Sequence, residues 1–310
     1  MISMNRKKRD EVVDNLSNMD LVEGTSLWKD AYLRFMKNKA AVTGLILLVL
    51  MTLLAFIGPY FTPWDYQSID WSLIGNAKDG GAPQIANRHY FGIDDLGRDI
   101  FARTMQGTQI SLMVGFVGTA VAVFVGLFYG AIAGFVGGRV DNIMMRFVDI
   151  LMSIPIMFVI IIFFVVFGRS IFLLFMAIGM FAWMDMARIV RGQTLAIKNK
   201  EYIEAARAAG VSGIRLITRH VIPNLLGIVV IYTSLLIPSL ILTESFISFL
   251  GLGIQEPLTS WGALINEGAG QMRYGVPWQL GFPIAFFVVG MFCFFFIGDG
   301  LRDALDPKDK

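Results

Sequence analysis

Long apolar runs and shorter polar segments alternate along this chain. Six apolar runs can be marked, at residues 40–57, 110–133, 147–167, 171–190, 225–249 and 281–297. About 20 apolar residues in a row are enough to cross the hydrocarbon core of a membrane as a helix. Strands of a membrane barrel instead alternate apolar and polar positions, which these solid runs do not. The pattern therefore predicts an all-α integral membrane protein with six transmembrane helices.

The polar segments divide the chain into a series of expected parts. In order, these are a cytoplasmic N-terminal segment with an interfacial helix (1–39), a first transmembrane helix (40–58), an extracytoplasmic segment (59–109), a core of five transmembrane helices (110–302) and a cytoplasmic tail (303–310). The interfacial helix is expected near residues 27–35. Two loops of the core, an inner one at 191–224 and an outer one at 250–280, are longer than ordinary connections, which favours a functional role for both.

The positions of the charged residues predict the orientation of the chain. Hydrophobic residues make up 55% and charged residues 16% of the 310 residues, and the net charge of +2 gives no reason to expect a nucleic-acid partner. With the N-terminus placed inside, twenty Lys and Arg residues fall on inner segments and six on outer ones. Because Lys and Arg are enriched in cytoplasmic loops, both termini are expected in the cytoplasm of a multi-pass inner-membrane protein.

The inner loop contains a short alanine-rich stretch that favours a helix, followed by Gly210. Glycine readily takes the left-handed conformation that ends a helix, Ser212 is a suitable cap for a second helix, and Pro223 is tolerated in the first turn of the next span. The loop is therefore expected to form two short helices with a sharp bend between them. The small side chains would let another surface approach closely, although an ordinary amphipathic helix at the membrane surface is the alternative.

This loop resembles the EAA coupling loop of ABC importer permeases, since Glu-Ala-Ala at 204–206 is followed by Gly210 and by Ile222-Pro223. His220 departs from the aliphatic residue of the broad pattern. The stretches at 91–99, 187–193, 248–253 with 260–262, and 298–307 are similar to the C-type membrane subunit of oligopeptide and dipeptide importers. The resemblance implies the ABC type I importer permease fold and a pore-forming subunit that imports oligopeptides.

The resemblance also implies partners and a coupling site. The expected partners are a second homologous permease, one or two cytoplasmic ATPase subunits, an extracytoplasmic substrate-binding protein, the peptide and membrane lipid. The residues expected to couple to the ATPase are Glu204, Ala205, Ala206, Arg207, Gly210, Ile222 and Pro223. The chain contains no Gly-Lys dipeptide and so no P-loop. We therefore expect no enzymatic activity and no cofactor on this chain, with ATP and Mg bound by the ATPase subunits.

The outer segments are expected to meet the substrate-binding protein, because they are long and rich in Gly, Trp and Pro. The candidate contacts are Asp95, Arg98, Asp99 and Trp261. The acidic run at 94–99 could instead bind a cation, but with two histidines in the chain we predict no metal site. Asp94 is expected to cap a short helix and Arg98 to pair locally.

Three residues within the spans are candidates for the translocation path, namely Glu244, Pro238 and Pro155. A carboxylate near the end of a span should face protein or water, so Glu244 either lines the path or bonds locally to Thr243 or Ser245. The two prolines are expected to kink their helices.

Two further carboxylates of the spans, Asp149 and Asp185, are expected to form structural ion pairs with Arg146 and Arg188 by helical spacing.

Other classes of protein remain as alternatives. A permease for nickel or another small solute would share most of these features. A secondary transporter should show paired broken helices at the membrane midplane, and a membrane enzyme should show clustered catalytic side chains within the spans. Neither pattern is evident in the sequence.

Overall fold

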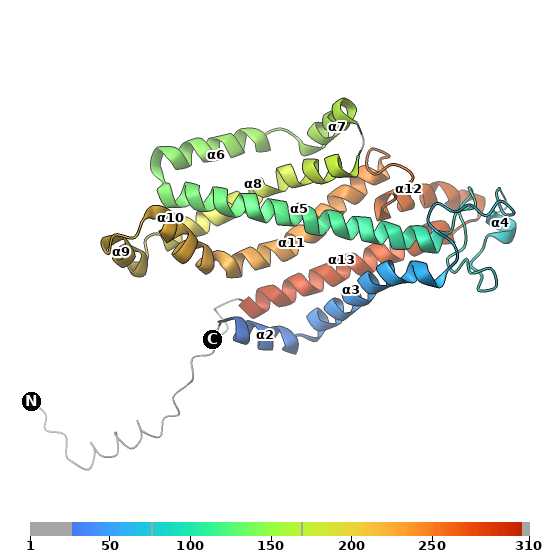
Figure 1. Ribbon diagram of the computed structural model, residues 1–310, viewed down its shortest axis with the longest axis horizontal. Coiled ribbons are helices and arrows are strands. Elements are labelled where there is room, and N and C mark those ends of the chain that lie inside the picture. The colour runs from blue at the N-terminus through green and yellow to red at the C-terminus, as the bar shows by residue number, and fades with distance from the viewer. Residues whose placement is uncertain (1–26, 76, 169, 306–310) are drawn as a thin grey trace, which may run out of the picture.

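A computed structural model describes residues 27–75, 77–168 and 170–305 of the chain (Figure 1). The regular elements of these residues are helices, and they follow one another as α2 (Leu27–Lys37), α3 (Lys39–Ile57), α4 (Ala77–Gly80), α5 (Ile100–Val136), α6 (Gly138–Met152), α7 (Ile156–Phe167), α8 (Ile171–Ile197), α9 (Glu201–Ala208), α10 (Gly213–Leu216), α11 (Ile222–Phe249), α12 (Trp261–Gln271) and α13 (Trp278–Leu305). Short turns of tighter or wider helix are η1 (Gly58–Phe61), η2 (Ile217–Val221) and η3 (Met272–Tyr274). Most of the expected N-terminal segment and most of the tail, at 1–26 and 306–310, lie outside the described residues.

Among the described residues, five stretches are long and apolar enough to cross a membrane: Lys39–Phe61, Ile100–Val136, Ile171–Ile197, Gly213–Phe249 and Trp278–Leu305. The pair α6 and α7 passes the same test together, and the two helices are bent by 75° relative to each other. Counting that pair as one span gives six. The prediction of an all-helical membrane protein is confirmed.

The predicted third span, 147–167, is wrong as a single helix. The chain leaves the helical conformation at Ser153 and Ile154, and Pro155 stands as the cap residue before α7 with ψ of 117°. Proline lacks the N–H that a helix interior needs, and it disfavours the helical conformation for the residue before it. Pro155 therefore breaks this span, where a kink was expected.

The other predicted spans are too short at one end or both. α5 begins at Ile100, ten residues before the predicted start, because the Asp99 side chain accepts a hydrogen bond from the N–H of Ala102 at 2.7 Å and caps the helix. α8 continues through polar residues to Ile197 and α13 to Leu305. An apolar run marks the part of a helix inside hydrocarbon, whereas the helix itself continues into polar sequence until a cap ends it.

α5 is the central helix of the bundle, and glycines let its neighbours approach closely. A Cβ added at Gly130 would lie 2.3 Å from the carbonyl oxygen of Ala187 on α8, and one at Gly126 would lie 2.7 Å from that of Trp183. Gly134 meets the same helix one turn further along. Small residues spaced four apart allow two membrane helices to pack backbone against backbone. This stripe holds α8 against the C-terminal half of α5, which lies at the α9 end of the bundle (Figure 1).

α3 and α13 pack together, and α2 lies across the ends of both (Figure 1). Asn38 caps α3 by accepting from the N–H of Ala41 at 3.1 Å, which separates α3 from α2. α2 carries exposed Trp28 and Tyr32. The predicted helix near residues 27–35 is therefore confirmed, and its exposed aromatic residues fit an interfacial position.

The bundle has two ends of different construction (Figure 1). α9 and α2 lie toward one end, whereas α4, α12 and the loops before α5 lie at the other. The candidate coupling residues and the candidate outer contacts are thus at opposite ends of the molecule.

Candidate functional site

The predicted coupling loop contains a helix, α9, that ends in a left-handed turn. Gly210 has a φ of +80°. The N–H of Val211 donates to the carbonyl of Ala206 at 3.1 Å, and the N–H of Gly210 donates to that of Arg207 at 3.0 Å. These two bonds form a Schellman motif, in which a left-handed residue closes the helix. The bend predicted at Gly210 is confirmed.

α9 is attached to the bundle by one side of its surface. Its buried residue is Ile203, which is 0% exposed and packs into a cluster that includes Leu127 and Ala131 of α5, Val190 of α8 and Ile217 and Val221 of η2. Away from Ile203, Glu204 and Ala205 are exposed and Ala206 is half-buried, and the exposed Arg207 follows Ile203 by one helical turn. The predicted small and charged residues of α9 therefore form an outward face with its backbone close to the surface.

Cationic groups of the coupling loop lie against the end of α5. The Arg207 guanidinium carbon is 5.6 Å from the centre of the Phe135 ring, and Nζ of Lys198 donates to the carbonyl of Gly134 at 2.9 Å. A cation over an aromatic face is attracted by the ring quadrupole. These contacts give α9 a second, polar attachment beside Ile203.

The second half of the loop differs from the prediction. α10, η2 and α11 form one continuous helical stretch, Gly213–Phe249, so the second helix is not short and separate. η2 is a π-helical turn that ends at Val221, two residues before Pro223. A π turn widens the helix at the point where the proline ring would otherwise meet the carbonyl four residues earlier. Ser212 occupies the cap position, but its side chain makes no capping hydrogen bond. Ile222 and Pro223 thus lie within a long helix, and Ile222 packs against the cluster that contains Ile203 of α9.

At the opposite end of the bundle, two arginines join segments that are far apart in the sequence. Arg98 Nε donates to Asp94 at 2.7 Å and Arg98 Nη1 to Glu256 at 2.5 Å. Arg103 Nη2 lies 2.9 Å from both carboxylate oxygens of Glu267 on α12. The Arg103 side chain is only 3% exposed. We call these five residues the outer ion network.

Burial and charge act in opposite directions within the outer ion network. The hydrogen bond from Arg98 lowers the pKa of Glu256 below its usual value. Burial raises the pKa of Glu267, and the charge of Arg103 opposes that rise. An enclosed arginine whose carboxylate partners are removed would be left with an uncompensated charge, which is costly. The network therefore fastens the outer loop at 250–280 to the start of α5.

Two of the four residues predicted to contact a binding protein are buried. Asp99 is 0% exposed, since it caps α5 and lies 2.8 Å from Nδ1 of His89. Trp261 is also 0% exposed, and its indole N–H donates to Thr108 at 3.0 Å. The prediction of a surface role for these two side chains is wrong, because both are needed to satisfy interior polar groups. Asp95 is exposed and so remains accessible, whereas Arg98 is 11% exposed and its guanidinium is bonded to Asp94 and Glu256.

Asp94 does not cap a helix. Its carboxylate accepts from the N–H groups of Leu96 and Arg98, at 2.9 and 2.8 Å, and from the Arg98 side chain. The expected local pairing of Arg98 with Asp94 is confirmed, with Asp94 holding a turn rather than a helix end.

Glu244 is enclosed inside the chain and not on an open path. It is 0% exposed, and its carboxylate accepts from the hydroxyls of Ser248 at 2.6 Å, Ser111 at 3.2 Å and Ser245 at 3.4 Å. Ser111 also accepts from the backbone N–H of Trp261 at 3.2 Å. The local hydrogen bond to Ser245 that the sequence left open is present. The lining role predicted for Glu244 has no support in this arrangement, because a hydroxyl cluster and α12 cover it.

The two prolines of the predicted path behave differently. Pro238 is buried inside α11, which continues through it without a break. Pro155 is exposed in the gap between α6 and α7. The positions of Pro155 and Pro238 do not show whether either lies on the translocation path, so that role stays a prediction.

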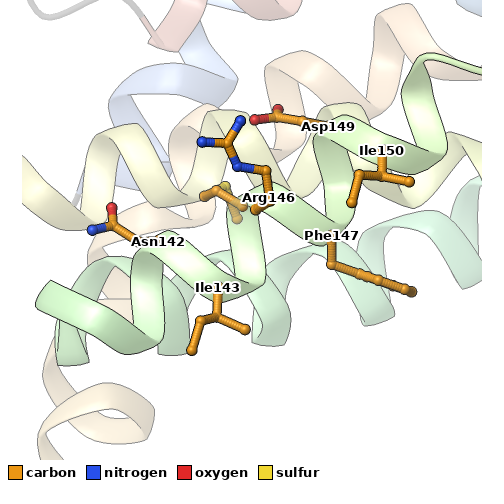
Figure 2. A pocket seen from close by; sticks show the side chains of 7 residues that line it. Asn142, Ile143, Arg146, Phe147, Asp149 and Ile150 are labelled. Carbon is orange, nitrogen blue, oxygen red and sulfur yellow. The ribbon is translucent and has the colours of Figure 1, made fainter.

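α6 has a polar and an apolar side. Figure 2 shows Asn142, Arg146 and Asp149 on one side of the helix and Ile143 and Phe147 on the other. An open pocket lies along this helix. A helix divided in this way is typical of one that meets two different surroundings.

The ion pairs expected within these helices differ from the sequence prediction. Asp149 of α6 pairs with Arg188 of α8, across two helices rather than by spacing along one. Asp185 has no ion pair among the described residues, so its expected pairing is wrong. The reason is geometric, since the guanidinium of Arg188, which was expected to pair with Asp185, pairs with Asp149 instead.

Sequence reasoning missed Arg103, Glu256 and Glu267, which complete the outer ion network. A usable signal was present, because the segment before and at the start of α5 carries two arginines and the outer loop carries two glutamates. Opposite charges on two long loops at the same end of a bundle indicate that the loops could pair.

Comparison with known proteins identifies the class of this chain. The family described as "Binding-protein-dependent transport system inner membrane component" matches residues 122–309, and a second model, "N-terminal TM domain of oligopeptide transport permease C", matches residues 26–78. The chain belongs to the binding-protein-dependent transport system inner membrane component family, and it is a transport permease subunit of the inner membrane.

Similar proteins cover nearly the whole chain. The "Oligopeptide transport system permease protein OppC" of Escherichia coli K12 is 56% identical over 304 residues, which is 98% of this chain and 99% of the relative. The protein of the same name from Bacillus subtilis is 44% identical over 91% of this chain and 90% of its own length. The "Dipeptide transport system permease protein DppC" of Bacillus subtilis is 40% identical, over 91% of this chain and 86% of the relative.

Proposed function

We propose that this chain is the pore-forming permease subunit of an ATP-driven importer for oligopeptides. The names and high identity of its relatives support peptides as the cargo. The observation that carries the mechanism is α9, a helix with a small, exposed outward face that is fixed at its end by a Schellman motif. Such a face allows close approach of a partner backbone, as a docking helix requires.

The proposed assembly has a second permease beside this chain, one or two ATPase subunits on α9, and a substrate-binding protein at the opposite end. ATP and Mg are bound by the ATPase subunits, and this chain supplies no catalytic residue. Both termini lie in the cytoplasm, as the distribution of Lys and Arg predicts. Of the residues predicted to contact the binding protein, Asp95 is exposed and Arg98 is partly exposed at 11%.

The test is Gly210→Val in the complete transporter. A Cβ at positive φ costs about 1 kcal/mol or more, and a β-branched side chain adds to that cost. Because no atom lies within 4 Å of the Cβ position, the effect is on the backbone turn and not on packing. Peptide uptake and ATPase recovery with the complex should fall steeply, while membrane-inserted protein and the second permease are retained.

Gly192→Val is the matched control. Gly192 is exposed on α8, has no atom within 4 Å of a Cβ and has no positive φ. It should leave uptake close to that of the wild type. Wild-type uptake and ATPase retention in Gly210→Val, measured per inserted protein, would show that α9 is not the coupling element.

A further inference from the structure

Asp185 is a carboxylate near the middle of α8, a helix long and apolar enough to cross a membrane. Its side chain is exposed on the chain. It makes no hydrogen bond or ion pair with any other described residue, whereas Arg188, one turn away, pairs with Asp149. A charged group within an apolar span is costly to expose to lipid, so it must meet water, a partner chain or a ligand.

A groove between α8 and α11 surrounds Asp185. Its volume is about 320 Å³, and it is lined by Asp185, Met186, Ile189, Tyr232, Leu235, Leu236 and Ser239. Two of these residues, Tyr232 and Ser239, bring hydroxyl groups from α11 to the same groove. The remaining lining is apolar, and it includes a flexible methionine that adapts to different shapes.

The hydroxyl groups of α11 fall into two sets. Five of them are bonded within the chain, since Thr233, Ser234 and Thr243 donate to carbonyls of their own helix and Ser245 and Ser248 donate to Glu244. The other two belong to Tyr232 and Ser239, and neither bonds to another described residue. Both therefore have hydrogen-bonding capacity left, and both line the groove that contains Asp185.

We propose that this groove binds the N-terminal end of a peptide in transit, with Asp185 accepting the α-ammonium group and Ser239 and Tyr232 bonding to its first backbone amides. The proposal rests on the proposed function. Oligopeptides of different sequence share their ammonium group, carboxylate and backbone, so a site that accepts many of them must use those groups. A carboxylate complements the ammonium end, and the apolar lining suits varied side chains.

The alternative occupant is a Lys or Arg of the second permease. The unpaired hydroxyls favour the peptide, because a side-chain cation has no acceptor for the O–H groups of Tyr232 and Ser239. A peptide end supplies an ammonium group together with amide N–H and C=O groups, which matches the three polar groups of the groove.

The test uses the complete transporter with its binding protein in proteoliposomes. Asp185→Asn should reduce peptide uptake about tenfold or more, since it removes a charge-assisted bond in a site of low dielectric. Peptide affinity of the binding protein and recovery of the intact complex should not change. Ser239→Ala should reduce uptake by a smaller factor. Ser234→Ala, which removes a hydroxyl bonded within its own helix, should have no effect.

A photoreactive tripeptide tests occupancy directly. With a benzoylphenylalanine at its second residue, and its N-terminus free, it should label α8 or α11 within the groove during turnover, and Asp185→Asn should abolish that labelling. Loss of complex recovery in Asp185→Asn would assign Asp185 to the partner permease and overturn the proposal. Unchanged uptake and labelling would also overturn it. Uptake of peptide by the wild-type complex tests the proposed function separately. An importer that does not carry peptides would fail in the wild type, whereas a groove that does not bind them would leave wild-type uptake intact.

Discussion

The two ends of this bundle are fastened in different ways. At one end, α9 is held by a single buried side chain, Ile203, and by the contact of Arg207 with Phe135. At the other end, the outer ion network connects the start of α5 with residues more than 150 positions later. Aromatic contacts add to it, since the Phe91 and Phe282 rings are stacked with centres 4.0 Å apart.

The two kinds of attachment suit different roles. A segment with few buried contacts opens at low free energy, whereas a segment held by several buried contacts opens only with the rest of the fold. A docking helix that follows a moving partner requires the first kind of attachment. The outer loops keep their shape by the second kind, which suits a surface that receives another protein without rearranging.

The largest expected effect is at the firmly held end, in Arg103→Met. Removing this buried guanidinium leaves Glu267 with only its longer contact to Arg98, at 3.5 Å, and breaking a buried ion pair from one side costs about 3–5 kcal/mol. The thermal midpoint of the purified chain, followed by fluorescence-detected size exclusion, should fall by several degrees.

Two further variants separate the network from a general loss of arginine. Arg273→Met alters an exposed arginine that lies over Tyr274, and it should change the midpoint little. Arg103→Met combined with Glu267→Met should recover part of the loss, because no buried charge is then left unpaired. If Arg103→Met behaved like Arg273→Met, the outer end would not be held by this network.

An intermediate effect is expected at the loosely held end, in Ile203→Ala. The change removes buried methylene groups and leaves a cavity, with a cost of about 2–4 kcal/mol. Because α9 has little else to hold it, that cost should appear as local opening. Hydrogen exchange of residues 201–212 should accelerate while exchange in α5 and α8 stays unchanged.

Ile214→Ala is the control, since Ile214 is 79% exposed on α10 and the same atoms are removed. It should leave exchange unaltered. Equal exchange in Ile203→Ala and the wild type would mean that α9 has an attachment beyond this side chain.

Strong local signals predicted much of the fold. The spans were found because solid apolar runs have few alternatives to membrane helices, and the turn after α9 was found because Gly210 supplies a conformation that other residues avoid. The two prolines show the limit. Pro155 ends a helix and Pro223 lies in a continuous one, although both follow apolar residues in the sequence. The outcome depends on whether the preceding turn can widen, as η2 does.

The candidate site was predictable only where its chemistry is local. The sequence predicts a surface role for Asp99 and Trp261, because their partners, His89 and Thr108, are set by tertiary packing that no local pattern reveals. The pairing of Arg98 with Glu256 joins residues 158 positions apart, and no spacing rule reaches that far. The sequence likewise could not show that Asp149 takes the arginine expected for Asp185.

The smallest expected effect concerns Glu256, the exposed member of the outer ion network, and it depends on pH. Its side chain is 61% exposed, so its pair with Arg98 is screened by water and contributes less than about 1 kcal/mol. The bond from Arg98 lowers the pKa of Glu256 from its ordinary value of 4.5. A carboxylate with a lowered pKa in the folded state stabilises that state above its unfolded pKa, and the contribution is lost as the pH falls through the folded pKa.

Glu256→Gln should therefore lower the thermal midpoint slightly at neutral pH, and the difference from the wild type should shrink once the pH falls below 4.5. Thermal midpoints of both proteins across that range decide the matter, with Glu201→Gln on the exposed face of α9 as the control. A difference in thermal midpoint that stayed constant down to the most acidic condition would show that the charge of Glu256 does not contribute to stability. Charge would then hold the outer end only through the pair of Arg103 and Glu267.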